Sequence, residues 1–248
     1  MMLDRKILVV SDNIELSIFV KSLLSRPEMD INFKLCHYRN NSKSLEFLEI
    51  ESFPIDFSKK DVIDWIVEEF DTVINVHGKQ IFPSQLTDQV RCVNIHPGLN
   101  PYNRGWYPQV FSIINGLPTG VTIHLMDRRI DGGPVLFQKQ VEIYDYDTSW
   151  DIYQRIIETE KKLLESRFSE IIDPSILGIE MKEAGNYNSQ SDFEALKDLK
   201  LDEIGTLREH LNLLRALSHN GFRNAKFRDS KGNLVTCSIS LNVISEET

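Results

Sequence analysis

An asparagine and a histidine stand two residues apart at the end of a short apolar run, and a carboxylate follows farther along the chain. Asn94 and His96 belong to Val93-Asn94-Ile95-His96-Pro97-Gly98, and Asp131 begins Asp131-Gly132-Gly133-Pro134. On an extended chain, residues two apart project from the same face, so the amide and the imidazole are expected side by side. The glycines after Asp131 allow that loop to approach a ligand closely.

An amide, an imidazole and a carboxylate are the groups that acyl transfer to an amine requires. When an amine attacks a formyl carbon, negative charge develops on the oxygen, and an amide N–H can stabilise it. The amine must also lose a proton, and histidine is the usual base near neutral pH. A carboxylate can orient the imidazole and stabilise its cation. The alternative is an ordinary polar turn with a surface histidine, because these residue types are common in loops.

Apolar runs and helical periodicities predict the elements that position these residues. Strands are predicted at 7–10, 31–38, 72–76, 93–95, 120–126 and 135–143, and helices at 16–24, 61–70, 106–115, 148–172 and 204–217. Strands that alternate with helices are typical of an open, mostly parallel α/β sheet. No GxGxxG sequence follows the first strand, so nothing indicates a dinucleotide cofactor.

The composition changes in the polar stretch 185–189, which is a candidate linker. It divides the chain into a catalytic domain, 1–185, and a C-terminal extension, 186–248. In the extension, a leucine-rich helix precedes a predicted hairpin of strands 224–227 and 234–241. This extension is expected either to pair with a second copy or to cover the sheet.

Composition and charge exclude several classes of function. The 248 residues carry a formal net charge of -9, which disfavours broad nucleic-acid binding. The 3 cysteines are few and well separated, so neither a disulfide framework nor a zinc cluster is expected, and no metal is expected elsewhere. No apolar run is long enough to cross a membrane, so the predicted location is the cytoplasm, without a membrane partner.

The segments 94–98 and 131–134, at this spacing, resemble the paired motif of the folate-dependent formyltransferases. The resemblance covers roughly residues 1–180 and is strongest from 73 to 134. It implies a Rossmann-like formyltransferase fold and N10-formyltetrahydrofolate as the formyl donor. It also implies that Asn94, His96 and Asp131 are the catalytic residues. His124 is expected to be a satisfied histidine near the core, and Cys92 has no evident activating neighbour.

In the family that the chain resembles, the pterin of the folate is held by the loop after the strand corresponding to 72–76. Here that loop is 80–86, and the residues around Met126 to Ile130 would form a second wall. An apolar side chain and a proline suit a flat ring, although Phe82 could equally fill the core. The predicted cofactor contacts are Gln80, Ile81, Phe82, Pro83, Leu86, Met126 and Ile130.

The loop after the histidine motif indicates a branch of the family. Most members have Leu-Leu-Pro there, whereas this chain has Leu99-Asn100-Pro101-Tyr102. That loop, the segment 77–83 and the closing segments 214–219 and 224–227 resemble the sugar N-formyltransferases, especially those acting on dTDP-4-amino-4,6-dideoxyglucose. The predicted substrate contacts are His77, Lys79, Asn100, Tyr102, Asn103, Arg104 and Trp106. A cation among them would meet the pyrophosphate, and an aromatic ring would stack on a base or sugar.

The resemblance further implies a homodimer and a product that enters bacterial surface polysaccharide, such as the O-antigen of lipopolysaccharide. Several alternatives remain open at this point. The acceptor amine could be at C-3, or the nucleotide could be UDP. Within the same family, the chain could instead be a purine-synthesis enzyme, an initiator-tRNA formyltransferase or a hydrolase of formyltetrahydrofolate. A non-catalytic binding protein with the same fold is the alternative of a different class.

Overall fold

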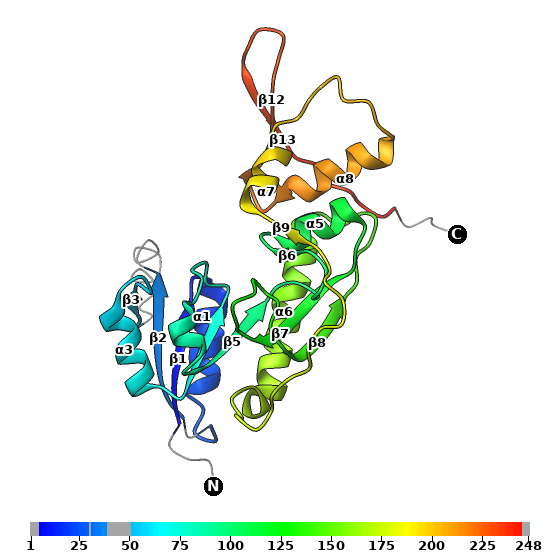
Figure 1. The fold of residues 1–248 in the computed structure, drawn as a ribbon. Coiled ribbons are helices and arrows are strands. Elements are labelled where there is room, and N and C mark those ends of the chain that lie inside the picture. The colour runs from blue at the N-terminus through cyan, green and yellow to red at the C-terminus, as the bar shows by residue number, and fades with distance from the viewer. Residues whose placement is uncertain (1–4, 30, 39–50, 245–248) are drawn as a thin grey trace. The chain divides into compact units, whose positions relative to one another are not determined.

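The computed structural model describes residues 5–29, 31–38 and 51–244 (Figure 1). Seven strands form one sheet in the order β3-β2-β1-β4-β5-β7-β8. Their bounds are β1 (Lys6–Ser11), β2 (Asn32–Tyr38), β3 (Phe53–Ile55), β4 (Thr72–Val76), β5 (Arg91–His96), β7 (Thr119–Leu125) and β8 (Val135–Val141). Neighbours from β3 to β5 are parallel, whereas β5 and β7 are antiparallel. The predicted mostly parallel α/β sheet is therefore confirmed.

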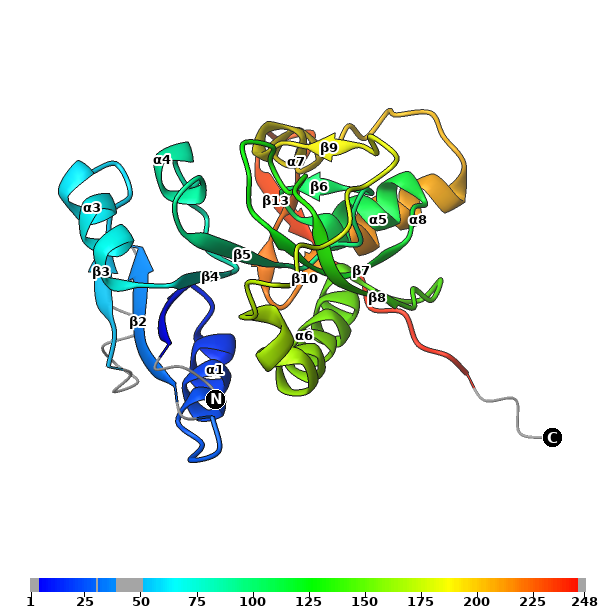
Figure 2. The same cartoon turned by 60° about the horizontal axis from the view of Figure 1, so that its bottom comes forward.

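The sheet is covered by helices because its parallel strands are apolar on both faces. One face packs against α3 (Lys60–Glu69) and α4 (Ser84–Thr87), which bring Ile63, Ile66 and Leu86 into one buried cluster. Leu8 and Val10 of β1 belong to this cluster, so the alternate residues of β1 point to the other face. Figure 2 shows β4 and β5 side by side, with α4 on the connection between them.

Helix α1 (Ile14–Leu24) follows β1 and lies beside the long helix α6 (Ser149–Ile171). Asn13 caps α1, because its side chain accepts a hydrogen bond from the backbone N–H of Leu16. Two ion pairs join α1 and its following turn to α6: Glu15 with Lys161 at 2.7 Å, and Arg26 with Glu165 at 2.8 Å. No helix among the described residues is long and apolar enough to span a membrane.

The chain forms two compact units that interleave in sequence. The first contains Met1–His96, Val121–Gln138 and Thr159–Lys182, and the second contains Pro97–Gly120, Lys139–Glu158 and Glu183–Thr248. The second unit includes the C-terminal segment but also two earlier segments that the predicted division at residue 185 assigned elsewhere. The functional division into 1–185 and 186–248 stays a prediction.

In the second unit, α5 (Pro108–Asn115) packs against α8 (Leu207–Leu217). Helix α5 begins two residues later than expected, because Tyr107 is left-handed (φ 50°) and Pro108 takes the first helical position. The remaining elements are β6 (Arg104–Gly105), β9 (Tyr187–Asn188), α7 (Gln190–Leu196), β10 (Ser218–His219), β11 (Phe222–Arg223), β12 (Ala225–Arg228) and β13 (Leu234–Cys237). The antiparallel β12–β13 pair confirms the predicted hairpin, although β13 ends earlier than expected.

The polar stretch 185–189, interpreted from the sequence as a linker, is part of the folded structure. Its strand β9 pairs with β6. The side-chain amides of Asn186 and Asn188 donate to Oδ1 of Asn103 at 2.8 and 3.3 Å. The polarity of this stretch therefore comes from a buried hydrogen-bond network, a feature that composition does not distinguish from a solvated linker.

Candidate active site

Asn94, His96 and Asp131 lie together at the carboxyl end of β5. Asn94 and His96 are 7% and 3% exposed, and Asp131 lies in the loop between β7 and β8. Nδ2 of Asn94 donates to Oδ1 of Asp131 at 3.0 Å, and Nδ1 of His96 lies 3.7 Å from the other carboxylate oxygen. Ligands of open α/β sheets bind at the carboxyl ends of strands, which is where this cluster lies. The catalytic roles of the three residues stay predictions.

The loop that carries Asp131 turns back sharply toward β5. The backbone N–H of Leu125 donates to the carbonyl of Pro134 at 2.9 Å and so closes the loop. Asp131 adopts a left-handed conformation, with a φ of 46°. A Cβ atom added at Gly133 would collide with the carbonyl oxygen of Leu125. Gly133 therefore allows the close approach of two backbone segments that brings Asp131 to Asn94.

Gly133→Ala is expected to lower kcat by about tenfold to a hundredfold, because small misplacements of a reacting group cost that much in rate. The added methyl must displace backbone, which moves the loop of Asp131. Steady-state kinetics together with thermal unfolding would test this expectation. Gly205→Ala is the control, since a Cβ there meets only the side-chain ends of Glu209 and His210, at 3.1 and 3.3 Å. An unchanged kcat in Gly133→Ala would contradict this account of the loop.

His124 and Asn75 extend the cluster, and neither was assigned to the site from the sequence. His124 is 1% exposed, and its Nε2 lies 3.2 Å from Nδ2 of Asn94 and 3.7 Å from Oδ1 of Asp131. His124 was expected to lie near the core with its ring nitrogens hydrogen-bonded, and this is correct. Its partners, however, are residues of the cluster. Asn75, on β4, donates from Nδ2 to Oδ1 of Asn94 at 2.8 Å. Only the strand register reveals these contacts, because it pairs Asn94 with both residues.

Cys92 also lies on β5, two residues before Asn94 and on the same face. It is 3% exposed, and burial raises the pKa of its thiol well above the ordinary value. A thiol held in its neutral form is a poor nucleophile, which agrees with the interpretation of Cys92 as a spectator.

The predicted folate loop divides into buried and exposed side chains. Phe82 and Leu86 are 4% and 0% exposed and pack in the core, where the ring of Phe82 lies 4.5 Å from that of Phe57. Their side chains therefore fill the core, and a cofactor contact of these two residues, through their backbone, stays a prediction. Ile81 is 76% exposed and Ile130 is 46% exposed.

Three other predicted cofactor contacts also lie in the first unit. Gln80 is engaged within the protein, since its Oε1 accepts from the backbone N–H of Phe57 at 3.2 Å. Met126 packs against the same core cluster as Phe82, and Pro83 is half-buried.

His77 follows β4 in a left-handed conformation (φ 56°), and its ring faces the protein interior. Its Nε2 lies 2.8 Å from Oε1 of Glu160, which is fully buried on α6. Burial raises the pKa of the Glu160 carboxyl, and the contact with His77 opposes that shift. The ring of His77 is thus engaged with Glu160, and its predicted contact with the substrate stays a prediction. Lys79, two residues later, is exposed.

The other predicted substrate contacts belong to the second unit. Asn103 is 1% exposed, and its carboxamide donates to Oγ of Ser112 at 3.1 Å and accepts from the amides described above. This network holds neighbouring segments together, and the predicted substrate contact of Asn103 stays a prediction. The guanidinium of Arg104 donates to the carbonyl of Ala184 at 3.0 Å. Asn100 is buried, whereas Tyr102 and Trp106 are half-buried.

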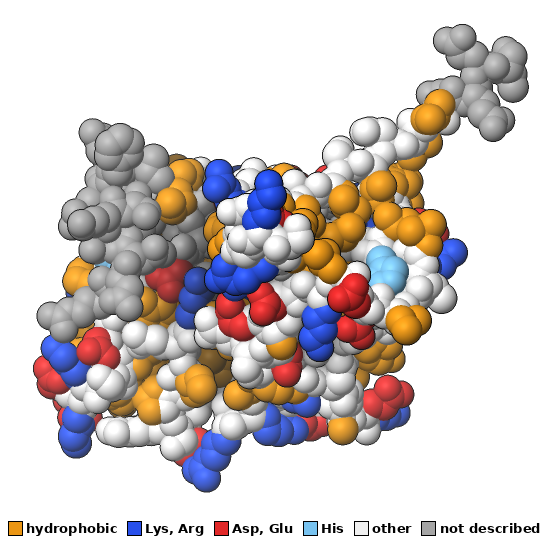
Figure 3. Space-filling view, turned by 90° about the horizontal axis from the view of Figure 1, so that it is seen from above, with side chains coloured by type: hydrophobic (Ala, Val, Ile, Leu, Met, Phe, Trp, Pro, Cys, Tyr) orange, Lys and Arg blue, Asp and Glu red, His pale blue; other side chains and the backbone are white. Residues whose placement is uncertain are grey.

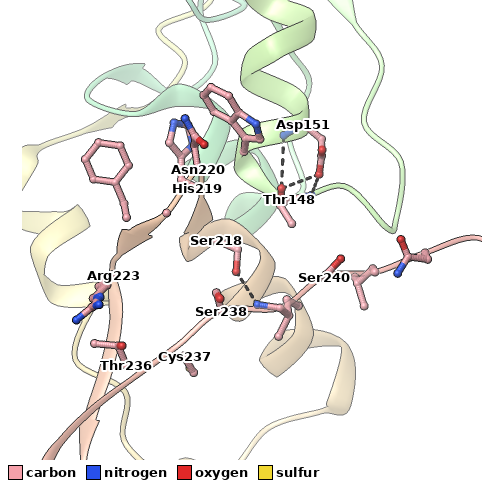
Figure 4. A pocket seen from close by; sticks show the side chains of 16 residues that line it. Thr148, Asp151, Ser218, His219, Asn220, Arg223, Thr236, Cys237, Ser238 and Ser240 are labelled. Carbon is pink, nitrogen blue, oxygen red and sulfur yellow. Dashed lines mark hydrogen bonds between the residues drawn. The ribbon is translucent and has the colours of Figure 1, made fainter.

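A pocket of about 530 Å³ lies in the second unit (Figure 4). Most of its lining comes from β10, β11 and the segment after β13, with Thr148, Trp150 and Asp151 from the start of α6. His219 lines it, and burial lowers the pKa of this histidine. None of the predicted site residues lines this pocket. Among the described residues, no group of three or more metal-ligating side chains comes together.

Comparison with known proteins identifies two family matches. Residues 58–168 match the formyl transferase family, and residues 192–244 match the N-formyltransferase dimerization C-terminal domain. The dTDP-4-amino-4,6-dideoxyglucose formyltransferase of Mycobacterium tuberculosis is 49% identical over 170 residues, which are 68% of this chain and 73% of that enzyme.

Two solved structures are similar over nearly their whole length. A sugar N-formyltransferase from Shewanella sp. FDAARGOS_354 has a TM-score of 0.92 and 42% identity, covering 97% of this chain and 99% of that one. A 4-N formyltransferase from Francisella tularensis has a TM-score of 0.90 and 37% identity, covering 97% of this chain and 99% of that one. The chain therefore belongs to the formyl transferase family and is a sugar N-formyltransferase.

Proposed function

We propose that the enzyme transfers the formyl group of N10-formyltetrahydrofolate to the amine of dTDP-4-amino-4,6-dideoxyglucose. The observation that carries this proposal is the cluster of Asp131 with the buried Asn94 and His96, which supplies an amide donor, an imidazole and a carboxylate at one point. The acceptor follows from similarity, because the M. tuberculosis relative named for that sugar is 49% identical.

The reaction is a direct acyl transfer. The amine nitrogen attacks the formyl carbon, and the carbonyl electrons move onto oxygen, where an N–H of Asn94 stabilises the charge. His96 accepts the proton that the amine loses, and Asp131 stabilises the resulting imidazolium from 3.7 Å. The electrons on oxygen then re-form the carbonyl, the bond from the formyl carbon to N10 breaks, and the imidazolium of His96 returns its proton to N10 as tetrahydrofolate leaves.

We propose Ile81, Pro83 and Ile130, all in the first unit, as folate contacts. Ile81 and Ile130 present exposed apolar surface, and Pro83 gives the loop a rigid backbone. Lys79 is exposed and carries the positive charge that a pyrophosphate requires, and Arg104 is the second candidate cation. We propose Tyr102 or Trp106 for stacking on the nucleotide or sugar.

The direct test is to incubate the purified enzyme with N10-formyltetrahydrofolate and dTDP-4-amino-4,6-dideoxyglucose and to follow the sugar by mass spectrometry. We expect the sugar to gain the mass of one formyl group, and we expect no gain with Asn94→Ala. If the sugar is unchanged, dTDP-linked 3-amino sugars and UDP-linked amino sugars are tested next. Release of formate without any formylated sugar would instead indicate a formyltetrahydrofolate hydrolase.

We further propose that the enzyme is a homodimer that associates through its C-terminal segment. Residues 192–244 match a domain named for dimerization. In that segment, Ile204 and Leu207 are 98% and 73% exposed, and Phe222 and Ile244 are 65% and 86% exposed. Figure 3 shows hydrophobic side chains gathered toward the upper right of this view. Exposed apolar area of this kind is typical of a surface that pairs with another chain.

The double substitution Leu207→Glu and Leu211→Glu is expected to weaken dimerisation at least about a hundredfold, since two charges would be buried in an apolar contact. Both side chains are exposed and lie one turn apart on α8. Sedimentation equilibrium at several concentrations measures the change. Ile18→Glu on α1, at a side chain 49% exposed, is the control. A dimer of wild-type strength in the double variant would place the interface elsewhere.

The use of the product and the cellular location of the reaction are also proposals. Formylated dideoxy sugars are constituents of bacterial surface polysaccharides, and we propose that the product enters such a polymer, for example the O-antigen of lipopolysaccharide. We propose the cytoplasm as the site of the reaction. Loss of N-formyl groups from the surface polysaccharide after deletion of the gene is the expected result, and unchanged polysaccharide would contradict it.

A further inference from the structure

Asn75 lies beside Asn94 in the sheet, on the strand that precedes β5 in the sheet order. The two residues are register partners on the parallel strands β4 and β5, and both are buried, at 4% and 7% exposure. Nδ2 of Asn75 donates to two acceptors: Oδ1 of Asn94 at 2.8 Å and the carbonyl oxygen of Gly78 at 3.3 Å. Asn75 therefore links the backbone after β4 to the side chain of Asn94.

The backbone carbonyl of Gly78 determines how both amides are oriented. A carbonyl oxygen can only accept, so the atom of Asn75 that faces it must be the amino nitrogen. The same nitrogen faces Asn94, so the atom of Asn94 that faces Asn75 must be its oxygen. This chain of contacts fixes the orientation of the Asn94 amide.

A second backbone carbonyl, on the side of Asn94 opposite to Asn75, requires the same orientation of the Asn94 amide. Nδ1 of His124 lies 2.8 Å from the carbonyl oxygen of Leu125, so Nδ1 carries the proton. In the neutral ring, Nε2 is then an acceptor, and it lies 3.2 Å from Nδ2 of Asn94. The amino group of Asn94 must therefore face His124. Two independent contacts thus place the Asn94 oxygen toward Asn75 and its N–H groups toward His124 and Asp131.

We propose that Asn75 is a positioning residue that, together with His124, holds the amide of Asn94 with its N–H groups on the side of His124 and Asp131. This inference rests on the proposed function, since it concerns the N–H that would stabilise the oxyanion. An inverted amide would set Oδ1 of Asn94 against the carboxylate of Asp131 and would offer no donor there. Gly78 is required by this arrangement, because a Cβ atom at that position would collide with Oδ1 of Asn75.

Asn75→Asp tests the proposal because a carboxylate has almost the same shape but cannot donate. The Asn94 amide is expected to flip, so that its N–H groups face the new carboxylate. We expect kcat to fall by about a hundredfold, comparable to loss of an oxyanion donor, with KM changed little. Burial raises the pKa of the introduced carboxyl, and its protonated form can donate again. The activity of the variant relative to wild type should therefore rise as the pH is lowered.

The tautomer of His124 gives a readout that does not depend on activity. Nitrogen NMR of the enzyme with labelled histidine distinguishes a proton on Nδ1 from one on Nε2, and comparison with His124→Gln assigns the signals. The wild-type ring is expected to carry its proton on Nδ1. In Asn75→Asp, the turned amide presents oxygen to Nε2, so a proton is expected on Nε2.

Two further variants separate positioning from general destabilisation. Asn75→Ala removes the donor without adding a competing acceptor, so we expect a smaller loss, about tenfold, and no rise at low pH. Val73→Thr is the matched control, because Val73 is fully buried on the same strand and face and belongs to the core cluster. It is expected to lower Tm while leaving kcat, its pH profile and the His124 tautomer unchanged.

The outcomes distinguish this inference from the proposed function. If the wild-type enzyme formylates none of the amino sugars, the proposed function fails, whereas the NMR result still decides the orientation of Asn94. If the wild type is active and Asn75→Asp keeps both its kcat and the Nδ1 tautomer, the positioning role of Asn75 is overturned. A loss of kcat that does not recover at low pH, with an unchanged tautomer, would also overturn it.

Discussion

His96→Ala is expected to lower kcat by at least about a hundredfold, the usual contribution of a positioned general base. The imidazole is 3% exposed at the carboxyl end of β5, so solvent has little access to replace it as the proton acceptor. Steady-state kinetics with the dTDP-linked amino sugar measure this effect.

Asp131→Asn is expected to lower kcat by about as much as His96→Ala does. It keeps the shape of the side chain but removes the negative charge that lies 3.7 Å from both His96 and His124. The imidazolium formed during the reaction then loses its counter-charge. Because the residues act as a unit, the double variant should lose little more than either single one.

Cys92→Ser is the control for both variants, since Cys92 lies on the same strand and face and its thiol is neutral. Its kcat should stay close to that of the wild type. Near-normal turnover in His96→Ala would remove the base from the mechanism, and near-normal turnover in Asp131→Asn would remove the counter-charge.

Asn94→Ala is expected to reduce kcat by about a hundredfold to a thousandfold, the range found when one oxyanion donor is removed. The amide lies 3.0 Å from Asp131 and 3.2 Å from His124, so its loss also leaves both partners without a buried hydrogen bond. The expected signature is a fall in kcat with the affinities for folate and sugar nearly unchanged.

Asn94→Asp separates the loss of the N–H donor from the loss of the side chain's shape. The isosteric carboxylate can still accept from Asn75, but it offers no N–H and stands against the carboxylate of Asp131. We therefore expect a kcat at least as low as that of Asn94→Ala. Turnover of Asn94→Asp above that of Asn94→Ala would show that shape, and not the N–H, is what Asn94 supplies.

The sequence alone determined the chemistry and most of the scaffold. The spacing of Asn94 and His96 on an extended segment placed both groups on one face, since alternate residues of a strand share a face. The apolar runs at β1 and β4 predicted buried parallel strands, and helical periodicity predicted α3 and α6 closely. These features are local, so a short window of residues is enough to reveal them.

The features that the sequence did not reveal depend on contacts between segments that are far apart in the chain. The polarity of residues 185–189 resembles that of a linker, yet Asn188 is buried against Asn103. Phe82 could serve a ligand or the core, and only packing against Phe57 decides for the core. A sequence does not show which of its polar or aromatic residues find a partner far along the chain.

The hydrogen bonds around Asn94 were decided by tertiary structure for the same reason. Asn75 and His124 come from strands on either side of β5, and their contacts with Asn94 exist only because of the strand register. Register is fixed by the packing of whole strands, and a shift of one residue would turn these side chains to the other face. The sequence by itself indicated which groups are candidates for the reaction, and the sheet decided how those groups are held.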